Sequence, residues 1–368
     1  MPAHEILVDH STPFGEDGTG HNRWHPDIPP ALSVAPGDTV VMQTRDGLDG
    51  QLGPGMGRDA DVSISLDAAH ALTGPVHVEG ARPGDLLEIR VLDIEPDSYG
   101  FTFQAPGFGL LRDDFPRPFK VEWALAGGFA TSDDLPGIRI PAAPFLGVMG
   151  VAPDAALLQA ITAREAADVE RGGVALPPNA ASAVPATPEI ARTALRTIAP
   201  HENGGNVDIK QLTAGARVFL PVHVPGALFS AGDAHYAQGD GESCGTAIEM
   251  AATSTLEFVL HPGRARDRGI RGLHFARDDA GPAPVPPARF YATTGIAVDR
   301  GGRSWSEDLT MAARDAVRTM IDHLGAEYGY TPQQAYAICS VAVDLRVSQV
   351  VDVPNVLVSA FLPLDVIG

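Results

Sequence analysis

The sequence is poor in aromatic residues and in cysteine. Aromatic residues make up 6% of the 368 residues, and there are two cysteines, Cys244 and Cys339. Two cysteines exclude a disulfide framework and a cysteine-rich zinc cluster. The start, MPAHEILVDH, lacks a basic stretch followed by an apolar run, and no stretch approaches the ~20 apolar residues of a membrane span. We therefore expect no signal peptide, no membrane partner and a cytoplasmic location.

Basic residues are also scarce. Lys and Arg total 26 against 46 Asp and Glu, which gives a formal net charge of −20. Nucleic acids and anionic membranes need basic surfaces, so this balance argues against both as partners. It suits a soluble enzyme that acts on neutral or cationic small molecules. We also expect a homodimer or a larger homo-oligomer.

Turn-forming residues, in contrast, are abundant: 40 Gly and 32 Pro divide the chain into short segments. Stretches of strand character recur about every 8 to 12 residues between these turns, the spacing of all-β proteins. They include 39–44, 86–94 and 252–260, and two more are expected at 341–346 and 356–362. We predict a mainly β fold in which residues 1–265 form a β-sandwich or barrel core, with a helical and loop excursion at 154–200. Residues 266–368 are predicted to form an α+β part with two helices and to return strands to the core.

Three helices can be predicted from their ends. Asp154 can cap a helix over 155–171, and Ser306 can cap one over 307–324 that Gly325 stops. Thr331-Pro332-Gln333-Gln334 is a capping box with proline at the first helical position, and it opens a helix to about Cys339.

Potentially catalytic side chains are most concentrated in 226–249, GALFSAGDAHYAQGDGESCGTAIE. If 229–236 is a strand, Asp233 and His235 point to the same face. The Gly-Asp-Gly turn that follows would fold Asp240 and Glu242 back toward His235. Converging acids and an imidazole indicate a hydrolytic metal site or an acid/base pair. The alternative is a solvated acidic turn.

Other polar residues lie at turns far away in the chain. Asn-Gly-Gly-Asn at 203–206 is a strong turn, and Asn206 and Asp208 would face the same way on a strand that begins there. Asp46 follows the predicted strand 39–44, a place where sites are often built. The proline-rich loop at 21–30 contains Trp24, which either lines a pocket or anchors the loop on the core.

In this order, the motifs resemble those of the acetamidase/formamidase family. The segments that carry the resemblance are HNRWHPDIPP (21–30), HALTGPVHVEGARPGDLLEI (70–89), GVMGVAP (147–153), HENGGNVDIKQL (201–212), LPVHVPGALFSAGDAHYAQGDGES (220–243) and LRVSQVVDVPN (345–355). Residues 97–137 and 160–200 match loosely. The resemblance implies a jelly-roll-like β-sandwich with a smaller α+β part. It also implies metal-dependent hydrolysis of a short carboxamide to a carboxylate and ammonia.

Side-chain chemistry then suggests roles within these motifs. We predict His235 and Asp208 as ligands of a divalent metal, zinc in preference to calcium. Glu242 is the predicted general base and later the proton donor to the leaving nitrogen. The further candidates are Asp46 and His70 as metal ligands, Asp46 and Asp240 as catalytic acids, and Trp24, Asn206 and Gln238 as substrate-binding or supporting groups.

Several alternatives stay open. Gly241-Glu242-Ser243-Cys244-Gly245 fits the nucleophile-elbow pattern, which needs a helix directly after Ser243. Cys244 beside Glu242 can be read as a thiol nucleophile of the Cys-Glu-Lys kind or as a buried core cysteine. The protein can also be a ligand-binding jelly roll with structural calcium that catalyses nothing, or a hydrolase of a larger amide or carbamate.

Overall fold

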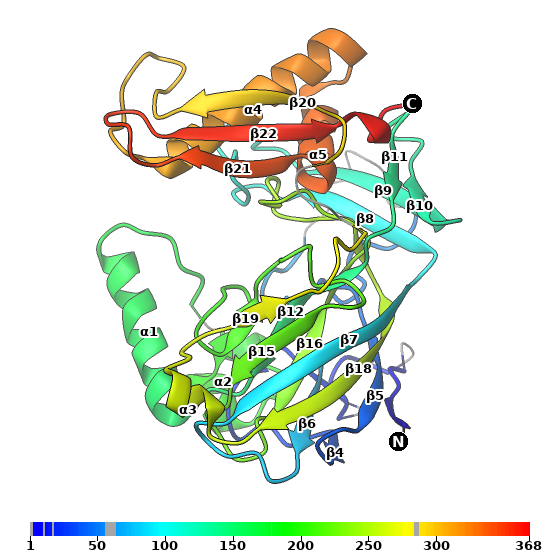
Figure 1. Cartoon of the computed structure of the whole chain (residues 1–368), viewed down its shortest axis with the longest axis vertical. Helices are drawn as coiled ribbons and strands as arrows, with labels where there is room; N and C mark the ends of the chain where they lie inside the picture. The colour runs from blue at the N-terminus through cyan, green and yellow to red at the C-terminus, as the bar shows by residue number, and fades with distance from the viewer. Residues whose placement is uncertain (1–2, 10–11, 17, 56–63, 178, 283–286) are drawn as a thin grey trace.

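Two large β-sheets form the body of the protein. The computed structural model describes all residues except 1–2, 10–11, 17, 56–63, 178 and 283–286 (Figure 1). Within the described residues, the first sheet has six strands. Their order is β1 (Ala3–Ile6), β5 (Thr39–Thr44), β18 (Ala252–His261), β7 (Leu86–Pro96), β15 (Arg217–Pro221) and β19 (His274–Ala276). The predicted strands at 39–44, 86–94 and 252–260 are therefore confirmed.

The second sheet carries the chemically rich segments. Its main path is β11 (Arg139–Pro141), β10 (Phe129–Thr131), β9 (Phe119–Ala126), β8 (Tyr99–Gln104), β17 (Glu249–Met250), β16 (Phe229–His235), β12 (Phe145–Val151) and β14 (Gly204–Asn206). Strand β6 (Leu72–Val78) pairs with β16 and also with the short strands β2 (Gly20–His21) and β4 (Leu32–Val34). Strand β16, from the centre of the motif at 226–249, therefore lies between other strands and not at an edge.

The two sheets pack face to face over one apolar core. In β5, the alternating residues Val40 and Met42 are fully buried, as period-two patterning requires of a strand with one face on a core. Phe229 of β16 meets Phe258 of β18 edge to face, with ring centroids 5.5 Å apart, so the contact joins the two sheets. Figure 1 shows β7, β15 and β18 in front of β12 and β16. The mainly β prediction is confirmed.

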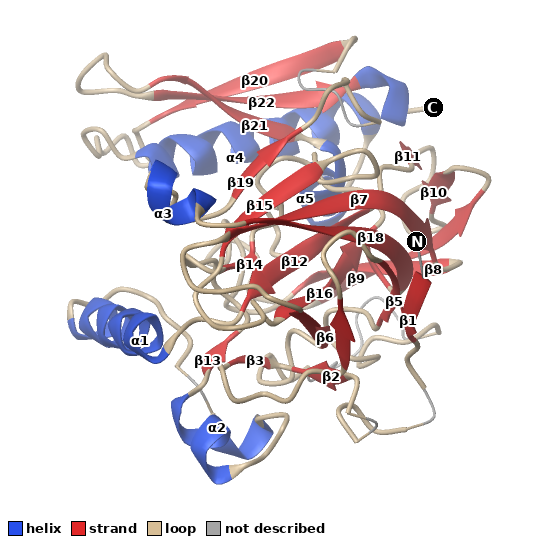
Figure 2. Ribbon diagram, turned by 60° about the horizontal axis from the view of Figure 1, so that its bottom comes forward, coloured by secondary structure: helices blue, strands red, loops and turns tan. Residues whose placement is uncertain are grey.

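The C-terminal part forms a separate layer. Strands β20 (Phe290–Ile296), β22 (Leu357–Pro363) and β21 (Asp344–Gln349) make a three-stranded sheet in that order. Helices α4 (Leu309–Tyr328) and α5 (Pro332–Ala342) pack against it (Figure 2). The strands expected near 341–346 and 356–362 lie in this sheet and do not pair with the two large sheets. Among the described residues of 266–368, β19 is the strand that joins a large sheet, where it pairs with β15.

Two of the predicted helix ends need correction. Asp308, and not Ser306, caps α4, because its carboxylate accepts a hydrogen bond from the Met311 amide at 2.8 Å. The helix continues through Gly325 and ends at Gly329, whose φ of 76° suits glycine. The capping box at Thr331 is present and opens α5 as expected.

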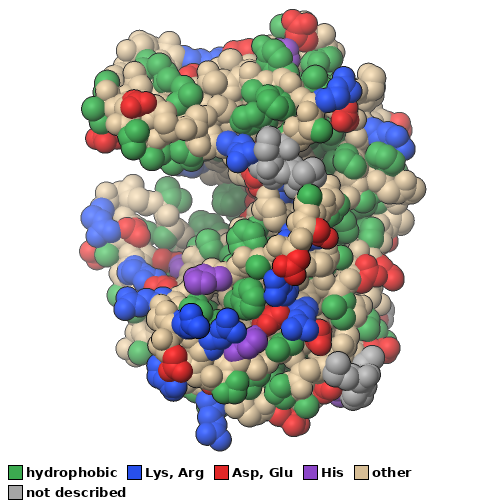
Figure 3. All heavy atoms as spheres, in the orientation of Figure 1, with side chains coloured by type: hydrophobic (Ala, Val, Ile, Leu, Met, Phe, Trp, Pro, Cys, Tyr) green, Lys and Arg blue, Asp and Glu red, His purple; other side chains and the backbone are tan. Residues whose placement is uncertain are grey.

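The excursion at 154–200 lies outside the two large sheets. Helix α1 (Ala155–Glu170) begins at the predicted cap Asp154, and the short helix α2 (Pro188–Thr193) leads to β13 (Leu195–Arg196), which pairs with β3 (Arg23–Trp24). The remaining elements are α3 (Arg264–Arg268) and the short 3₁₀ turns Ala180–Ser182 and Leu364–Val366. Figure 3 shows a notch in the surface between α1 and the C-terminal layer.

None of the helices in the described part of the chain has the length and apolar character needed to cross a membrane. The cytoplasmic location and the homo-oligomer stay predictions.

Candidate active site

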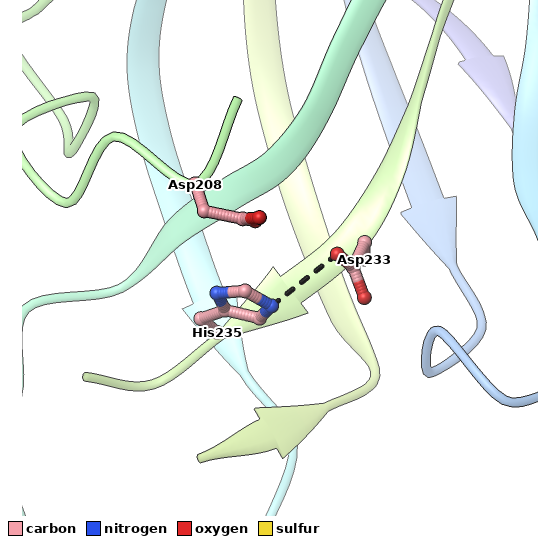
Figure 4. Close-up of side chains that lie close together, drawn as sticks. All are labelled: Asp208, Asp233 and His235. Atoms are coloured by element: carbon pink, nitrogen blue, oxygen red, sulfur yellow. Dashed lines mark ion pairs between the residues drawn. The ribbon is translucent and has the colours of Figure 1, made fainter. Parts of the chain in front are cut away.

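The site is built first on the pairing of β16 with β17. Strand β16 carries Asp233 and His235, and their side chains point into the same region, as predicted (Figure 4). In the antiparallel register, Glu249 of β17 lies directly opposite His235. Directly paired side chains on one sheet face are close neighbours. As a result, His235 Nε2 lies 3.4 Å from Asp233 Oδ2 and 3.1 Å from Glu249 Oε2.

Asp208 approaches His235 from the side of β16 that pairs with β12, opposite to β17. Strand β14 pairs with β12, and the chain then leaves the sheet at Asp208, which has a φ of 45°. The Asp208 amide donates to the Gly147 carbonyl of β12. Its carboxylate points toward His235 and Asp233 (Figure 4). The predicted strand through Asp208 therefore ends two residues early, but the predicted convergence of Asp208 with His235 is present.

Glu242 completes the cluster through a turn. Its amide donates to the Gly239 carbonyl at 3.0 Å, and its φ is 41°. Ligand atoms of Asp208, Asp233 and His235 lie within 4.8 Å of one another, and so do those of His235, Glu242 and Glu249. The two triads share His235, so four carboxyl side chains surround one imidazole.

Three of these residues have a left-handed backbone. Asp208, Asp233 and Glu242 have φ values of 45°, 55° and 41°, in a region that residues with side chains seldom adopt. Such conformations cost about 1–3 kcal/mol each and persist where the surrounding structure holds them, often at functional sites. The surrounding structure therefore holds three strained residues in positions that direct their carboxylates toward His235.

Burial and mutual interactions shift the pKa values of the residues in the cluster. Burial, partly offset by His235, raises the pKa of Asp208 to about 7. Burial likewise raises the pKa of Glu249 to about 7 and that of Glu242 well above its ordinary value. Burial also disfavours a charged His235, but the carboxylates of Glu249 and Asp233 outweigh it and hold the pKa of His235 well above its usual range.

Asp233 is the exception among the acids. Burial alone would raise its pKa, but the neighbouring His70 and His235 hold the pKa of Asp233 well below its usual range. The site therefore combines one strongly acidic carboxyl with three that hold their protons to higher pH in the metal-free protein. Such a spread is characteristic of sites that perform acid/base chemistry or hold a cation.

The donor atoms around His235 fit a divalent metal. Asp208 Oδ1, His235 Nε2 and Glu249 Oε2 are buried atoms that make no hydrogen bond of good geometry, although the last two lie 3.1 Å apart as an ion pair. Buried polar atoms are normally paired, so three such atoms around one point indicate an absent partner. Gly147 lines the point: a Cβ there would lie 2.6 Å from Asp208 Oδ1 and 2.8 Å from Asp233 Oδ2. One imidazole and several carboxylates form a donor set that suits a divalent metal.

Gln238 fixes the orientation of His235. The Gln238 amide group donates to the Asp208 carbonyl at 2.8 Å, which leaves its oxygen 3.0 Å from His235 Nδ1. His235 Nδ1 is therefore the N–H donor, and Nε2 faces the carboxylates. Gln238 was predicted as a substrate-binding or supporting residue, and the structure places it behind the imidazole, where partners of metal-binding histidines typically lie.

The Q238L variant should consequently bind a divalent metal more weakly. Partners of this kind contribute roughly 10–100-fold to metal affinity, so we expect a loss in that range, with activity restored by excess metal. The Q211L variant is the matched control, since Gln211 contacts Asp240 and not His235. Titration of metal-free protein with zinc measures the effect, and equal affinity of Q238L and wild type would contradict it.

A small cavity opens onto the cluster. Its volume is about 60 Å³. Its walls are mostly apolar, while Asp233, Glu242 and Glu249 line one side and Asn206 contributes an amide. The apolar side chains include Leu48, Leu66, Phe103, Phe108 and Ile198. Asn206 donates through Nδ2 to the Ile198 carbonyl at 3.1 Å, and its buried Oδ1 has no partner. The predicted substrate-binding role of Asn206 is compatible with this position.

The other predicted ligands lie at different distances from the cluster. His70 lines the cavity, with Nε2 3.9 Å from Asp233 Oδ2, so it is adjacent to the cluster but outside both triads. Asp46 is close enough to interact with the charge of Asp233, but its oxygens accept hydrogen bonds from the Leu48 and Gly50 amides. Asp46 therefore stabilises its own turn and belongs to neither triad, and its predicted roles stay predictions.

Asp240 and Trp24 lie away from the cluster. The Asp240 carboxylate is 3.4 Å from Gln211 Nε2, and its amide donates to Asp344. The turn thus directs Glu242 toward His235 but Asp240 away from it. Trp24 packs in a small apolar group with Leu72 and Leu195, so it anchors the loop at 21–30 and does not line the cavity.

Two members of the cluster were not among the predicted site residues. Strand alternation places Asp233 on the same face as His235, and this signal would have been sufficient to identify it as a site residue. Glu249 lies at the end of the same motif, and only the register of β17 against β16 places it opposite His235.

Neither nucleophilic alternative has the geometry it needs. No helix follows Ser243: the described chain from 243 to 248 consists of turns and extended segments before β17. Cys244 is buried, and burial raises the pKa of its thiol to about 11, which disfavours the thiolate. The chain has only two lysines. Lys120 pairs with Glu122 and Lys210 with Asp344, so neither is available for a Cys-Glu-Lys site.

The turn at 242–246 is held by helix α5. Ser340 Oγ accepts a hydrogen bond from the Cys244 amide at 3.0 Å and donates to the Thr246 carbonyl at 2.6 Å. The Tyr336 hydroxyl donates to the Ser243 carbonyl. The C-terminal layer therefore positions the turn that carries Glu242.

The pKa directions predict how the metal-free protein responds to pH. Between about pH 4 and pH 7, the unfolded chain has released the protons of Asp208 and Glu249 while the folded protein still binds them. Stability contributed by these groups therefore falls as pH rises through this window. Metal-free wild type should lose more thermal stability than E249Q between about pH 5 and about pH 8. Added zinc should stabilise wild type more at the higher pH, because ligands must be deprotonated. Equal pH slopes for the two proteins would contradict this.

Comparison with known proteins gives a consistent result. A family model described as Acetamidase/Formamidase matches residues 7–368. The chain is 35% identical to a formamidase from Methylophilus methylotrophus, over 96% of this chain and 91% of the relative. It is 37% identical to an acetamidase from Mycolicibacterium smegmatis, over 92% and 89%. A solved γ-lactamase from Delftia acidovorans is 34% identical with a TM-score of 0.93, and the match covers 100% of this chain and 93% of that one. The likeness therefore includes the sandwich and the C-terminal layer.

Proposed function

Because the chain belongs to the acetamidase/formamidase family, we propose that it is an amidase that hydrolyses short carboxamides to a carboxylate and ammonia with the help of a divalent metal. One observation carries the proposal. Asp208, Asp233, His235, Glu242 and Glu249 converge at the end of a small apolar cavity, and three of them present buried atoms that make no hydrogen bond. The formamidase and acetamidase relatives support the reaction type.

Zinc is the proposed metal, held by His235 together with Asp208, Asp233 and Glu249. An imidazole at the centre of the donor set favours zinc over calcium, which takes oxygen ligands. This also disfavours a purely structural calcium site. Bound there, the ion would supply a Lewis acid that polarises the amide carbonyl and makes water more acidic.

Glu242 is the proposed proton carrier. It lines the cavity, and burial raises the pKa of its carboxyl well above the ordinary value, with the nearby Asp208 charge adding to the effect. A carboxyl with a raised pKa can accept a proton from the attacking water and return it to a leaving group near neutral pH. The water oxygen bonds to the carbonyl carbon, the carbon–nitrogen bond breaks, and the nitrogen leaves as ammonia after it receives the proton.

Asn206 and the cavity volume define the substrate. Because Asn206 Nδ2 is engaged by the Ile198 carbonyl, its free Oδ1 can accept an N–H from the amide group. The cavity of about 60 Å³ is small, since a single water already needs ~10–15 Å³. A small cavity with apolar walls favours formamide or acetamide over an amide whose acyl chain is several carbons longer. A larger amide or carbamate is therefore disfavoured.

A small cyclic amide is the second candidate. The observation in its favour is the close structural match to the γ-lactamase over the whole chain. Ring opening of a lactam needs the same attack on a carbonyl, with the nitrogen remaining tethered to the product.

An amide panel tests both candidates. Ammonia release from formamide, acetamide and hexanamide, together with ring opening of 2-pyrrolidinone, is measured on protein purified without an affinity tag, before and after treatment with chelator. Elemental analysis of the same sample identifies the metal. We expect turnover of formamide and acetamide that is lost with chelator and restored by zinc. Absence of turnover on every amide would disprove the proposal.

A further inference from the structure

A second cavity lies next to the one that opens onto the acid cluster. The outer cavity has a volume of about 300 Å³, against about 60 Å³ for the inner one. Both cavities are lined by Phe108 and Ile198, so these two side chains lie between them. Glu165 and Asp168 of α1 line the outer cavity, and α1 borders the notch in the surface (Figure 3).

Phe108 is fixed against the turn that carries Glu242. A Cβ added to Gly245 would lie 2.5 Å from Phe108 Cδ1, so the ring packs directly on this glycine. The loop of Phe108 is closed by a hydrogen bond from its own amide to the Ala105 carbonyl at 3.1 Å. The Leu110 amide then donates to the Ser243 carbonyl at 2.9 Å and ties the loop to the turn. The ring thus has a defined position relative to the acids.

Ile198 is fixed from the opposite side. Its carbonyl accepts the hydrogen bond from Asn206 Nδ2, at 3.1 Å. The backbone that carries Ile198 is thereby connected to the proposed substrate-binding amide. Both side chains are half-buried, because each has one cavity on either side.

The far side of this wall suits an uncharged aliphatic group. Val174, Ala175 and Leu176 provide an apolar surface in the outer cavity. The charged groups there are mostly engaged with each other or with neighbours. His201 Nε2 lies 3.2 Å from Glu165 Oε1, and Arg196 pairs with Asp67 at 3.6 Å. Each methylene of a longer chain that was buried on this surface would strengthen binding about fourfold.

We propose that Phe108 and Ile198 form a partition that sets the acyl-chain length of the substrate. In the wild type, the two side chains close the inner cavity and exclude chains longer than a few carbons. Their removal joins the two cavities, and the end of a longer chain then lies against Val174 and Leu176. This inference rests on the proposed amide hydrolysis, and it assigns its chain-length limit to two residues outside the acid cluster.

The test compares wild type with F108A, I198A and the double variant F108A/I198A. The ratio of kcat/KM for hexanamide to that for acetamide should rise at least about 10-fold in the double variant, because several methylenes gain a binding surface. Acetamide turnover should fall only several-fold. F275A is the matched control, since Phe275 is exposed on β19 and lines neither cavity. F108L replaces F108A if thermal unfolding shows that the alanine variant is not folded.

A binding measurement separates this inference from the proposed function. Calorimetric titration with hexanamide reports on the partition even if the wild type hydrolyses no amide. We expect hexanamide to bind the double variant at least about 10-fold more tightly than the wild type. If the wild type hydrolyses acetamide, but a folded double variant shows neither a changed substrate ratio nor tighter binding, the partition is wrong while the amidase assignment stands.

Discussion

Replacing His235 by alanine should lower kcat/KM for acetamide by about 1,000-fold or more and should abolish binding of the proposed metal. The imidazole is fully buried, lies at the centre of both ligand triads and is the only nitrogen donor in them among the described residues. A Lewis-acid ion contributes several kcal/mol to catalysis, and about 4 kcal/mol corresponds to a factor of roughly 1,000. Metal content by elemental analysis and ammonia release, measured on the same sample, check the prediction.

A matched control distinguishes a local from a general effect. His77 on β6 is hydrogen-bonded to Ser33 Oγ and does not line the cavity, so H77A should keep both metal and turnover. The D208N variant should resemble H235A in metal loss, because Asp208 Oδ1 is one of the buried atoms without a partner. If H235A retained a full equivalent of metal and full turnover, the assignment of the site would be wrong.

The E242Q variant should behave differently: it should keep the metal and lose kcat. Glutamine retains the size of the side chain and its contact with the cavity but cannot carry the proton. Removal of a general acid/base typically costs about 100- to 10,000-fold, so we expect kcat for acetamide to fall within that range. The limb of the pH–rate profile that reports this carboxyl should also disappear, because glutamine does not titrate.

The outcome for E242Q decides between two roles of one side chain. Glu242 also belongs to the second ligand triad, with His235 and Glu249. Loss of metal from E242Q would make it a ligand, whereas unchanged kcat would remove it from the chemistry altogether. The D240N variant is the control, since Asp240 lies two residues away in the same turn but contacts Gln211 and Asp344. D240N should retain turnover within a few-fold of wild type.

Local patterns in the sequence were sufficient for much of the fold. Strand character between turns predicts β5, β7 and β18, and side-chain caps predict α1 and α5, because both signals depend on neighbours along the chain. The cap of α4 was misplaced by two residues because Ser306 and Asp308 are both good cap residues, and only the tertiary position of the helix selects Asp308. Similarly, Gly325 lies within α4, where helix packing outweighs its low helix propensity.

The site was predictable only in part, for related reasons. His235 and Asp233 share a face through strand alternation, and Asp208 follows a recognisable turn. Glu249 requires the register of β17 on β16, which no local pattern specifies. Asp46 and Glu242 both follow sharp turns, yet Asp46 caps its own turn while Glu242 points into the cavity. Distinguishing them needs the path of the backbone.

The hydrogen bonds from Tyr336 and Ser340 to the turn at 242–246 make the two halves of the protein interdependent. A fragment that contained only the sandwich would keep His235 and Asp233 on β16 but would lose the support for Glu242. Catalysis therefore depends on attachment of the C-terminal layer. Loosening of α5 by heat or denaturant should inactivate the enzyme before the sandwich itself unfolds.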